Sequence, residues 1–170
     1  HTDLDSQLNE LLAAPDWYVG FSGGVDSTVL LHLLHQWCAA NPASPTLSAF
    51  HVNHGMQSAA ANWQRHCAEV CRWYGLPLIT RTVEVHTAGS GEAAARAERY
   101  RAFEEQLPPG AILFLGHHLD DQVETFFLRL LRGAGVEGLA AMPRRRTMGE
   151  GLLVRPLLDY GRSEIEHYAA

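Results

Sequence analysis

The chain has 170 residues, of which 46% are hydrophobic, and a formal net charge of −6 at pH 7. This length fits one domain with a sizeable core, and the acidic balance argues against a broad nucleic-acid surface, which is usually basic. The apolar runs are too short for a transmembrane helix and the acidic start argues against a signal peptide, so we expect a cytoplasmic protein whose three Cys form no disulfide framework.

Hydrophobic periodicity and turn residues predict helices and strands in regular alternation. In chain order we predict a helix over 4–13, a strand over 17–21, a helix over 27–40, a strand over 47–52, a helix over 58–74, a strand over 78–85, a helix over 91–107, a strand over 111–116, a helix over 119–131, a strand over 152–158 and a helix from 162 onward. This order predicts a single α/β domain with a doubly wound, Rossmann-like parallel sheet of five strands. Ligands of such sheets bind beyond the carboxyl ends of the strands, so the loops after the first, second and fourth strands should face one crevice.

The loop after the first predicted strand reads SGGVDS, from Ser22 to Ser27, and leads directly into a helix. Adjacent glycines allow the backbone to approach a ligand closely, and the N–H groups and dipole of the first helical turn favour phosphate. Asp26 repels a phosphate unless a cation lies between them, so the loop predicts a Mg²⁺-bound polyphosphate. It is not a Walker A loop, because that motif needs a Lys and all 13 basic residues of this chain are Arg.

The second predicted strand ends in polar residues, His51, Asn53 and His54. These side chains could form hydrogen bonds to a nucleotide or to the reacting group. A polar transition from strand to loop is the alternative interpretation.

The fourth predicted strand leads into His117, His118, Asp120 and Asp121. Carboxylates at the start of a helix are favoured as caps and by the helix dipole, but two carboxylates with two His exceed what a cap needs. One Asp could share Mg²⁺ with Asp26. Either His could act as acid or base, or hold a phosphate.

The helix predicted over 91–107 places Arg96 and Arg99 three residues apart on one face. They could reach phosphates, or they could pair with Glu92 and Glu104 on a solvated surface. Other features have simpler interpretations. We interpret Arg144–Arg146 as a solvated loop, and Cys67 with Cys71 as buried small residues, because no second pair completes a metal site.

The SGGVDS loop resembles the pyrophosphate-binding loop (PP-loop) of the N-type ATP pyrophosphatases. Together with HVNHG, GEAAARAERY, GHHLDDQVET, LLRGAGVEGLAAM and RPLLDYGRSEIEHYA in this order, it makes residues 15–170 similar to the tRNA(Ile)-lysidine synthetase family. We therefore expect an N-terminal helical segment over 1–14, from the hydrophobic pattern, followed by the PP-loop catalytic domain over 15–170 that the resemblance implies. That family continues with another motif and RNA-binding domains, so the chain resembles an N-terminal fragment, and we expect it to bind ATP but not to complete tRNA modification.

The resemblance implies a ligase that activates the C2 position of cytidine 34, in the CAU anticodon of tRNA(Ile), by adenylating its O2. L-lysine then attacks C2, and AMP and pyrophosphate are released. ATP and Mg²⁺ are the implied cofactors, and RNA binding is expected mainly outside this segment. The implied nucleotide-binding residues are Ser22, Gly23, Gly24, Val25, Asp26, Ser27, His51 and His54. The implied metal ligands are Asp26 and Asp121, the implied catalytic residues are Asp26, Asp120, Asp121 and His117, and the implied substrate-binding residues are Glu92, Arg96, Arg99 and Arg132.

Three alternatives stay open. A tRNA thiolase shares the loop, although such enzymes often carry CxxC pairs that this chain lacks. A small-substrate amidotransferase or synthetase would release pyrophosphate in response to a small acid instead of tRNA. A nucleotide-binding module inactive alone would bind ATP without turnover.

Overall fold

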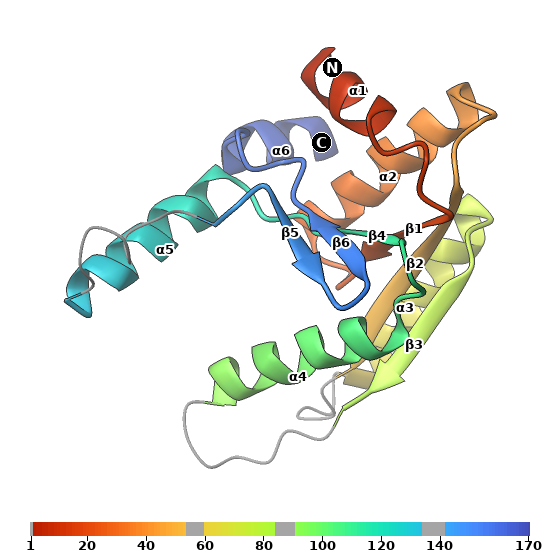
Figure 1. Cartoon of the computed structure of the whole chain (residues 1–170). Coiled ribbons are helices and arrows are strands. Elements are labelled where there is room, and N and C mark those ends of the chain that lie inside the picture. The colour runs from red at the N-terminus through yellow and green to blue at the C-terminus, as the bar shows by residue number, and fades with distance from the viewer. Residues whose placement is uncertain (1, 54–59, 84–90, 134–141) are drawn as a thin grey trace.

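The structure, a computed structural model, describes residues 2–53, 60–83, 91–133 and 142–170 (Figure 1). Helices and strands alternate along the chain, as the sequence predicts. The helices are α1 (Thr2–Asn9), α2 (Val25–Ala40), α3 (Ala60–Tyr74), α4 (Gly91–Gln106), α5 (Leu119–Leu131) and α6 (Arg162–Ala169). The strands are β1 (Asp16–Gly20), β2 (Thr46–Asn53), β3 (Leu78–Thr82), β4 (Ile112–Phe114), β5 (Arg145–Met148) and β6 (Gly151–Val154).

The sheet has its first strand at the centre, in the order β3-β2-β1-β4-β6-β5. β1 is parallel to β2 on one side and to β4 on the other. The chain first builds outward through β2 and β3, and then returns to the opposite side of β1 with β4. The strand order therefore reverses between β1 and β4, which is where open α/β sheets bind their ligands.

The predicted count of five strands is wrong, because β5 adds a sixth strand at the edge of the sheet. β5 pairs with β6 in antiparallel register, from Arg145 opposite Val154 to Met148 opposite Gly151. The sequence analysis interpreted Arg144–Arg146 as a loop, since consecutive Arg residues show no apolar alternation. Edge strands commonly carry charged side chains, which oppose pairing with another chain. The α/β class and the parallel arrangement of the other five strands are confirmed.

Several predicted boundaries extend too far, because apolar runs mark burial more faithfully than they mark hydrogen-bonded structure. α1 ends at Asn9 instead of residue 13, and β6 ends at Val154 instead of residue 158. Leu157 and Leu158 are nevertheless buried, at 2% and 4% exposure, in the turn that follows β6.

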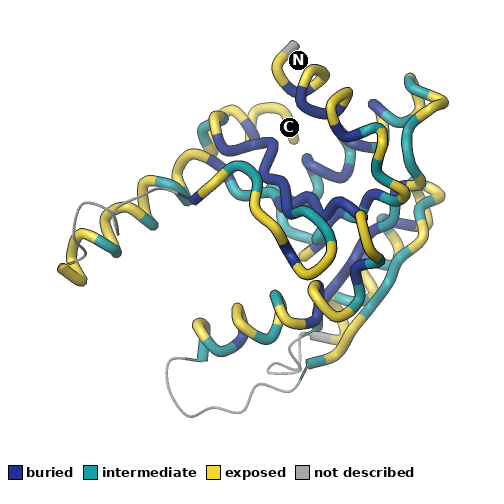
Figure 2. Tube along the Cα trace, viewed as in Figure 1, coloured by how far each residue is buried: buried dark blue, intermediate teal, exposed yellow. Residues whose placement is uncertain are grey.

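The core has two hydrophobic clusters, one on each face of the sheet, as expected for a doubly wound fold. Alternate residues of β4 divide between them, since Ile112 and Phe114 belong to one cluster and Leu113 to the other. The first cluster packs α1, α2, α3 and α6 against the sheet around the fully buried Trp17. The second packs α4 on the opposite face, as the buried segments in Figure 2 indicate.

α5 differs from the other helices, because it extends away from the sheet (Figure 1) and none of its residues is buried. Large apolar side chains on it are exposed, including Phe127 at 54% and Leu131 at 83%. Within the described residues, the protein has no helix that is both long enough and apolar enough to cross a membrane.

Candidate active site

The loop between β1 and α2 is closed by its own serine hydroxyls. Oγ of Ser22 accepts a hydrogen bond from the Gly24 N–H at 3.3 Å and lies 3.0 Å from Oγ of Ser27. Oγ of Ser27 in turn donates to the Gly24 carbonyl oxygen at 3.1 Å. Gly24 is the N-cap of α2 and offers no side chain to cap it, so the first helical turn presents N–H groups suited to an anion.

At two glycines of the site, the backbone lies so close to a neighbouring segment that a Cβ atom would make a tight contact. Gly23 has φ +84°, and a Cβ there would lie 3.0 Å from Sγ of Cys67. A Cβ on Gly116, in the loop after β4, would lie 3.1 Å from the carbonyl oxygen of Asp26. The loop after β4 therefore approaches the first turn of α2 closely only because residue 116 has no side chain.

This approach brings together the two carboxylates predicted to bind Mg²⁺. Nε2 of His118 lies 3.6 Å from Oδ2 of Asp26 and 3.6 Å from Oδ2 of Asp121. His118 is buried, at 4% exposure, and its backbone N–H donates to Oδ2 of Asp121 at 2.9 Å. Asp26 and Asp121, which are 95 positions apart in the sequence, thus converge on one imidazole.

Asp120 lies near the other nitrogen of the same ring, with its Oδ2 3.7 Å from Nδ1 of His118, but it also contacts another helix. Its Oδ2 accepts a hydrogen bond from the backbone N–H of Arg162, in the first turn of α6, at 2.7 Å. Asp120 does not line the cavity described below. Its carboxylate therefore fastens α5 to α6.

His51 lies at the end of β2, on the other side of β1. Its Nδ1 is 2.8 Å from the carbonyl oxygen of Phe21, the residue just before the Ser22–Ser27 loop, which we call the phosphate loop. His51 is 6% exposed. His54, the second histidine of this motif, lies outside the described residues.

α4 covers the site from the opposite direction with Arg96, Arg99 and Tyr100. The Arg96 guanidinium lies 5.3 Å from the centre of the Tyr100 ring, and that of Arg146, on β5, lies 4.9 Å from it. Contacts of this kind are cation–π interactions. Desolvation, with the nearby charge of Arg96, lowers the pKa of Arg99. Glu92 also belongs to α4, but its side chain lies outside the described part of the structure.

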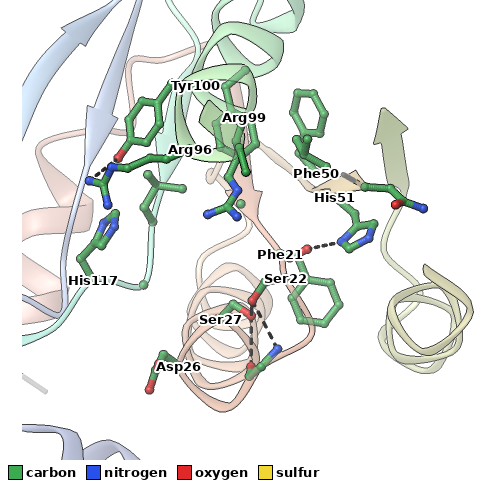
Figure 3. A pocket seen from close by; sticks show the side chains of 18 of the residues that line it. Phe21, Ser22, Asp26, Ser27, Phe50, His51, Arg96, Arg99, Tyr100 and His117 are labelled. Atoms are coloured by element: carbon green, nitrogen blue, oxygen red, sulfur yellow. Dashed lines mark hydrogen bonds between the residues drawn. The ribbon is translucent and has the colours of Figure 1, made fainter. Parts of the chain in front are cut away.

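The phosphate loop, the end of β2, the loop after β4 and α4 together line one cavity of about 540 Å³. This volume lies within the usual size range of small-molecule sites. Figure 3 shows the loop residues at one end, and Arg96, Arg99 and Tyr100 at the other. The predicted site residues that line the cavity are Ser22, Gly24, Asp26, Ser27, His51, Asn53, Arg96, Arg99, His117 and Asp121. The predicted residues that the structure describes and that do not line it are Gly23, Val25, His118, Asp120 and Arg132.

Arg132 is the C-cap of α5 and is exposed. Asp121 is the one residue of α5 that lines the cavity, so the exposed apolar side chains of this helix form no part of the lining. The predicted substrate-binding role of Arg132 therefore has no support from its position.

Several residues of the site were not predicted from the sequence. Tyr100 and Phe50 line the cavity, and Arg155 lies behind it, with its Nε donating to Nδ1 of His117 at 3.2 Å. Helical spacing could have found Tyr100, one turn after Arg96. Arg155 is a single charged residue inside the apolar run LLVRPLL, a pattern that indicates a buried charge with specific partners.

The donors at the site fit Mg²⁺ bound together with a nucleotide. Within the described residues, no group of three or more His, Cys, Asp or Glu side chains could hold a metal ion unaided. Mg²⁺ usually needs only one or two protein carboxylates when substrate phosphates supply other ligands. Asp26 and Asp121, held near each other beside the phosphate loop, match that requirement.

Comparisons with known proteins agree with the geometry. The chain is 55% identical to the tRNA(Ile)-lysidine synthase of Pseudomonas aeruginosa over 170 residues, which cover 98% of this chain and 38% of that protein. It is 54% identical to the protein of the same name from Pseudomonas putida over 162 residues, covering 95% and 38%. The chain thus spans about two fifths of the length of these curated relatives.

Among solved structures, the fold resembles that of the U34-tRNA thiolase NcsA from Methanococcus maripaludis. The TM-score is 0.71 at 20% sequence identity, and the match covers 99% of this chain and 62% of that one. At this identity the likeness concerns the fold alone. The PP-loop domain family matches residues 1–170, and a phosphate loop at the strand reversal of a doubly wound sheet is consistent with that match. The chain belongs to the PP-loop domain family.

Proposed function

We propose that the chain is the nucleotide-binding catalytic segment of an ATP-dependent tRNA-modifying ligase that forms lysidine. One observation above all carries the ATP chemistry, namely the convergence of Asp26 and Asp121 beside the phosphate loop. The names of relatives that are 54% and 55% identical supply the acceptor, tRNA(Ile), and the product. The protein acts in the cytoplasm, where tRNA is modified.

The phosphate loop would hold the β and γ phosphates of ATP. The first-turn N–H groups of α2 and the Ser22 and Ser27 hydroxyls are donors suited to phosphate oxygens. Asp26 and Asp121 would hold Mg²⁺, which neutralises charge that develops on the pyrophosphate. In the adenylation, O2 of cytidine 34 bonds to the α phosphorus as the bond from that phosphorus to pyrophosphate breaks.

The opposite end of the cavity suits the acceptor. Arg96 and Arg99 lie about one helical turn apart on α4 and line the same cavity as the phosphate loop. Their guanidinium groups suit the phosphates of an anticodon loop or the carboxylate of L-lysine. The amine of lysine would attack C2, and AMP would leave with the oxygen that the adenylation activated.

The cysteines argue against sulfur transfer. Burial raises the pKa of Cys67 and of Cys71 to about 11, so both remain protonated thiols, which are poor nucleophiles and poor metal ligands. Both side chains belong to the hydrophobic core. The likeness to a thiolase structure therefore carries no proposal of thiolase activity.

Calorimetric titration of ATP–Mg²⁺ into the chain, with GTP–Mg²⁺ as the control, tests the nucleotide half of the proposal. Selective binding of ATP is expected, and equal or absent binding of both nucleotides contradicts it. The acceptor half is tested in the full-length protein by pyrophosphate release with tRNA(Ile) carrying CAU, with and without L-lysine. Release that responds to a small acid but not to this tRNA would contradict lysidine formation.

A further inference from the structure

Arg155 is a buried cation whose partners are all neutral. The residue is 3% exposed and follows β6 directly. Its Nη1 donates to the carbonyl oxygen of Pro143 at 2.7 Å, its Nη2 to the Tyr100 hydroxyl at 3.4 Å, and its Nε to Nδ1 of His117 at 3.2 Å. Among the described residues, no carboxylate lies within ion-pair distance of this guanidinium. A buried charge normally has a counter-charge. The described residues provide none for Arg155, and an anionic ligand in the neighbouring cavity can provide it.

The bond from Arg155 to His117 fixes which imidazole nitrogen carries the proton. A guanidinium can only donate hydrogen bonds. Nδ1 of His117 must therefore accept, and in a neutral imidazole the proton then resides on Nε2. His117 lines the cavity, whereas Arg155 lies behind it.

The charges around His117 keep its ring neutral. Burial and the nearby charges of Arg155, and of Arg96 and Arg99 on α4, together lower the pKa of His117 to about 4. The Asp121 carboxylate opposes this effect. At neutral pH the ring therefore has one proton, and its only lone pair on nitrogen is already engaged by Arg155.

We propose that Arg155 is a positioning residue that makes His117 a neutral hydrogen-bond donor, through Nε2–H, to an anionic oxygen of the bound substrate. The identity of this oxygen rests on the proposed function, according to which it belongs to a phosphate of ATP. His117 then cannot serve as a general base, because the nitrogen that would accept a proton is occupied. It resembles in principle a neutral histidine that polarises an oxygen instead of taking a proton.

The second histidine of the cavity has the opposite polarity. Nδ1 of His51 faces the carbonyl oxygen of Phe21, which can only accept. Nδ1 of His51 therefore carries the proton, and Nε2 has the lone pair. Figure 3 shows the two rings on opposite sides of the cavity, and His51 comes from β2 whereas His117 comes from the loop after β4. His51 is thus an internal reference for His117.

The protonation of both rings can be measured by nitrogen NMR on the ¹⁵N-histidine-labelled chain without ligand at pH 7. We expect a protonated Nε2 and an unprotonated Nδ1 for His117, and the reverse for His51. The His117→Gln and His51→Gln variants assign the two resonance pairs. A His117 ring with a protonated Nδ1, or an imidazolium, would overturn the proposal without any bearing on ATP binding.

Variants separate positioning from a general effect on folding. Arg155→Met removes every side-chain N–H donor, so it should replace the single His117 tautomer by a mixture and leave His51 unchanged. Arg145→Met is the matched control, because Arg145 lies on β5 and forms its ion pair with Glu10 at 2.8 Å, away from both histidines. In this control the tautomers of His117 and of His51 should both stay as in the unsubstituted chain. A fixed Nε2–H tautomer in Arg155→Met would refute the positioning role. If that variant does not fold, the spectrum of the unsubstituted chain still decides the tautomer.

Ligand binding tests the donor role. ATP–Mg²⁺ should move the His117 Nε2–H proton resonance downfield. The same titration with inorganic pyrophosphate identifies the phosphate that is contacted, because a shift with pyrophosphate points to the β and γ phosphates and a shift with ATP alone points to the α phosphate. His117→Gln retains a side-chain N–H donor and should keep ATP affinity within about 3-fold, whereas His117→Leu should weaken it roughly 10-fold or more. Shifts of the loop amides without any shift at His117 would contradict the donor role. No shift at either place would contradict the proposed nucleotide site and the anionic ligand with it, while the tautomer result would stand.

Discussion

Gly23 is a residue at which the backbone itself requires glycine. Its φ of +84° lies in the left-handed region, and an added Cβ would meet Sγ of Cys67 at 3.0 Å. Gly23→Ala should therefore lower the free energy of unfolding by about 1–3 kcal/mol, measured by urea denaturation. Gly24→Ala is the matched control, since φ is −76° there and the added Cβ would lie 3.5 Å from Oγ of Ser22. Equal losses in the two variants would contradict this account.

The two neighbouring aspartates of α5 should separate in their effects. Asp26→Ala and Asp121→Ala remove the two carboxylates that lie 3.6 Å from Nε2 of His118 and line the cavity, so each should abolish Mg²⁺-dependent ATP binding while the fold remains. Asp120→Ala should instead leave that binding intact and lower the free energy of unfolding by about 1 kcal/mol, because it removes the acceptor for the Arg162 N–H. Titration calorimetry and thermal denaturation measure the two effects. Loss of ATP binding in Asp120→Ala would restore its predicted catalytic role.

At the scale of elements, the attachment of β6 to β4 depends on Gly151. A Cβ at this position would lie 2.6 Å from the Ala111 carbonyl oxygen, which accepts a hydrogen bond from the Leu152 N–H at 3.0 Å. Gly151→Ala should destabilise the protein by about 2–4 kcal/mol, because backbone must move to relieve the contact. The matched control is Gly161→Ala, where the nearest atom is the flexible Glu164 carboxylate at 3.4 Å. A loss below 1 kcal/mol at Gly151, on the same denaturation scale, would show that β6 can shift freely.

The parallel strands, the helices and their order along the chain were predictable from the sequence. The antiparallel pair of β5 and β6 at the edge of the sheet was not. Continuously apolar runs such as Ile112–Phe114 identify strands covered on both faces. β5 has no such signal, because its pairing with β6 depends on the turn at Gly149 and on a neighbour instead of on its own pattern.

The candidate site followed the same division. The motifs predicted that the loop residues and Asp121 would lie near one another, because both follow strands beside the strand reversal, and Ser22, Asp26, Ser27 and Asp121 line one cavity. Arg155 was missed, since its role arises from contacts with Tyr100, Pro143 and His117, which come from three other segments. Asp120 and Asp121 could not be separated in sequence, because the direction of each carboxylate depends on where α6 begins.

At the scale of the whole molecule, the neutral state of His117 couples the site to stability. In the folded chain burial lowers the pKa of His117 to about 4, while an unfolded histidine titrates near 6.5. Between these values the unfolded chain binds more protons than the folded one, so the free energy of unfolding falls as the pH decreases from about 6.5 to 4. The stability linked to this residue is complete above pH 6.5 and amounts to about 3 kcal/mol.

Urea denaturation at several pH values measures this linkage. His117→Gln should lose less stability than the unsubstituted chain between about pH 6.5 and 4, because glutamine does not titrate. His167→Gln, which changes an exposed histidine on α6, is the matched control and should follow the unsubstituted chain. Parallel curves for all three proteins would mean that His117 takes up its proton equally in the folded and unfolded states. The ring would then be accessible to protons at the pH of catalysis, and the same data would argue for an acid–base role in place of a fixed donor.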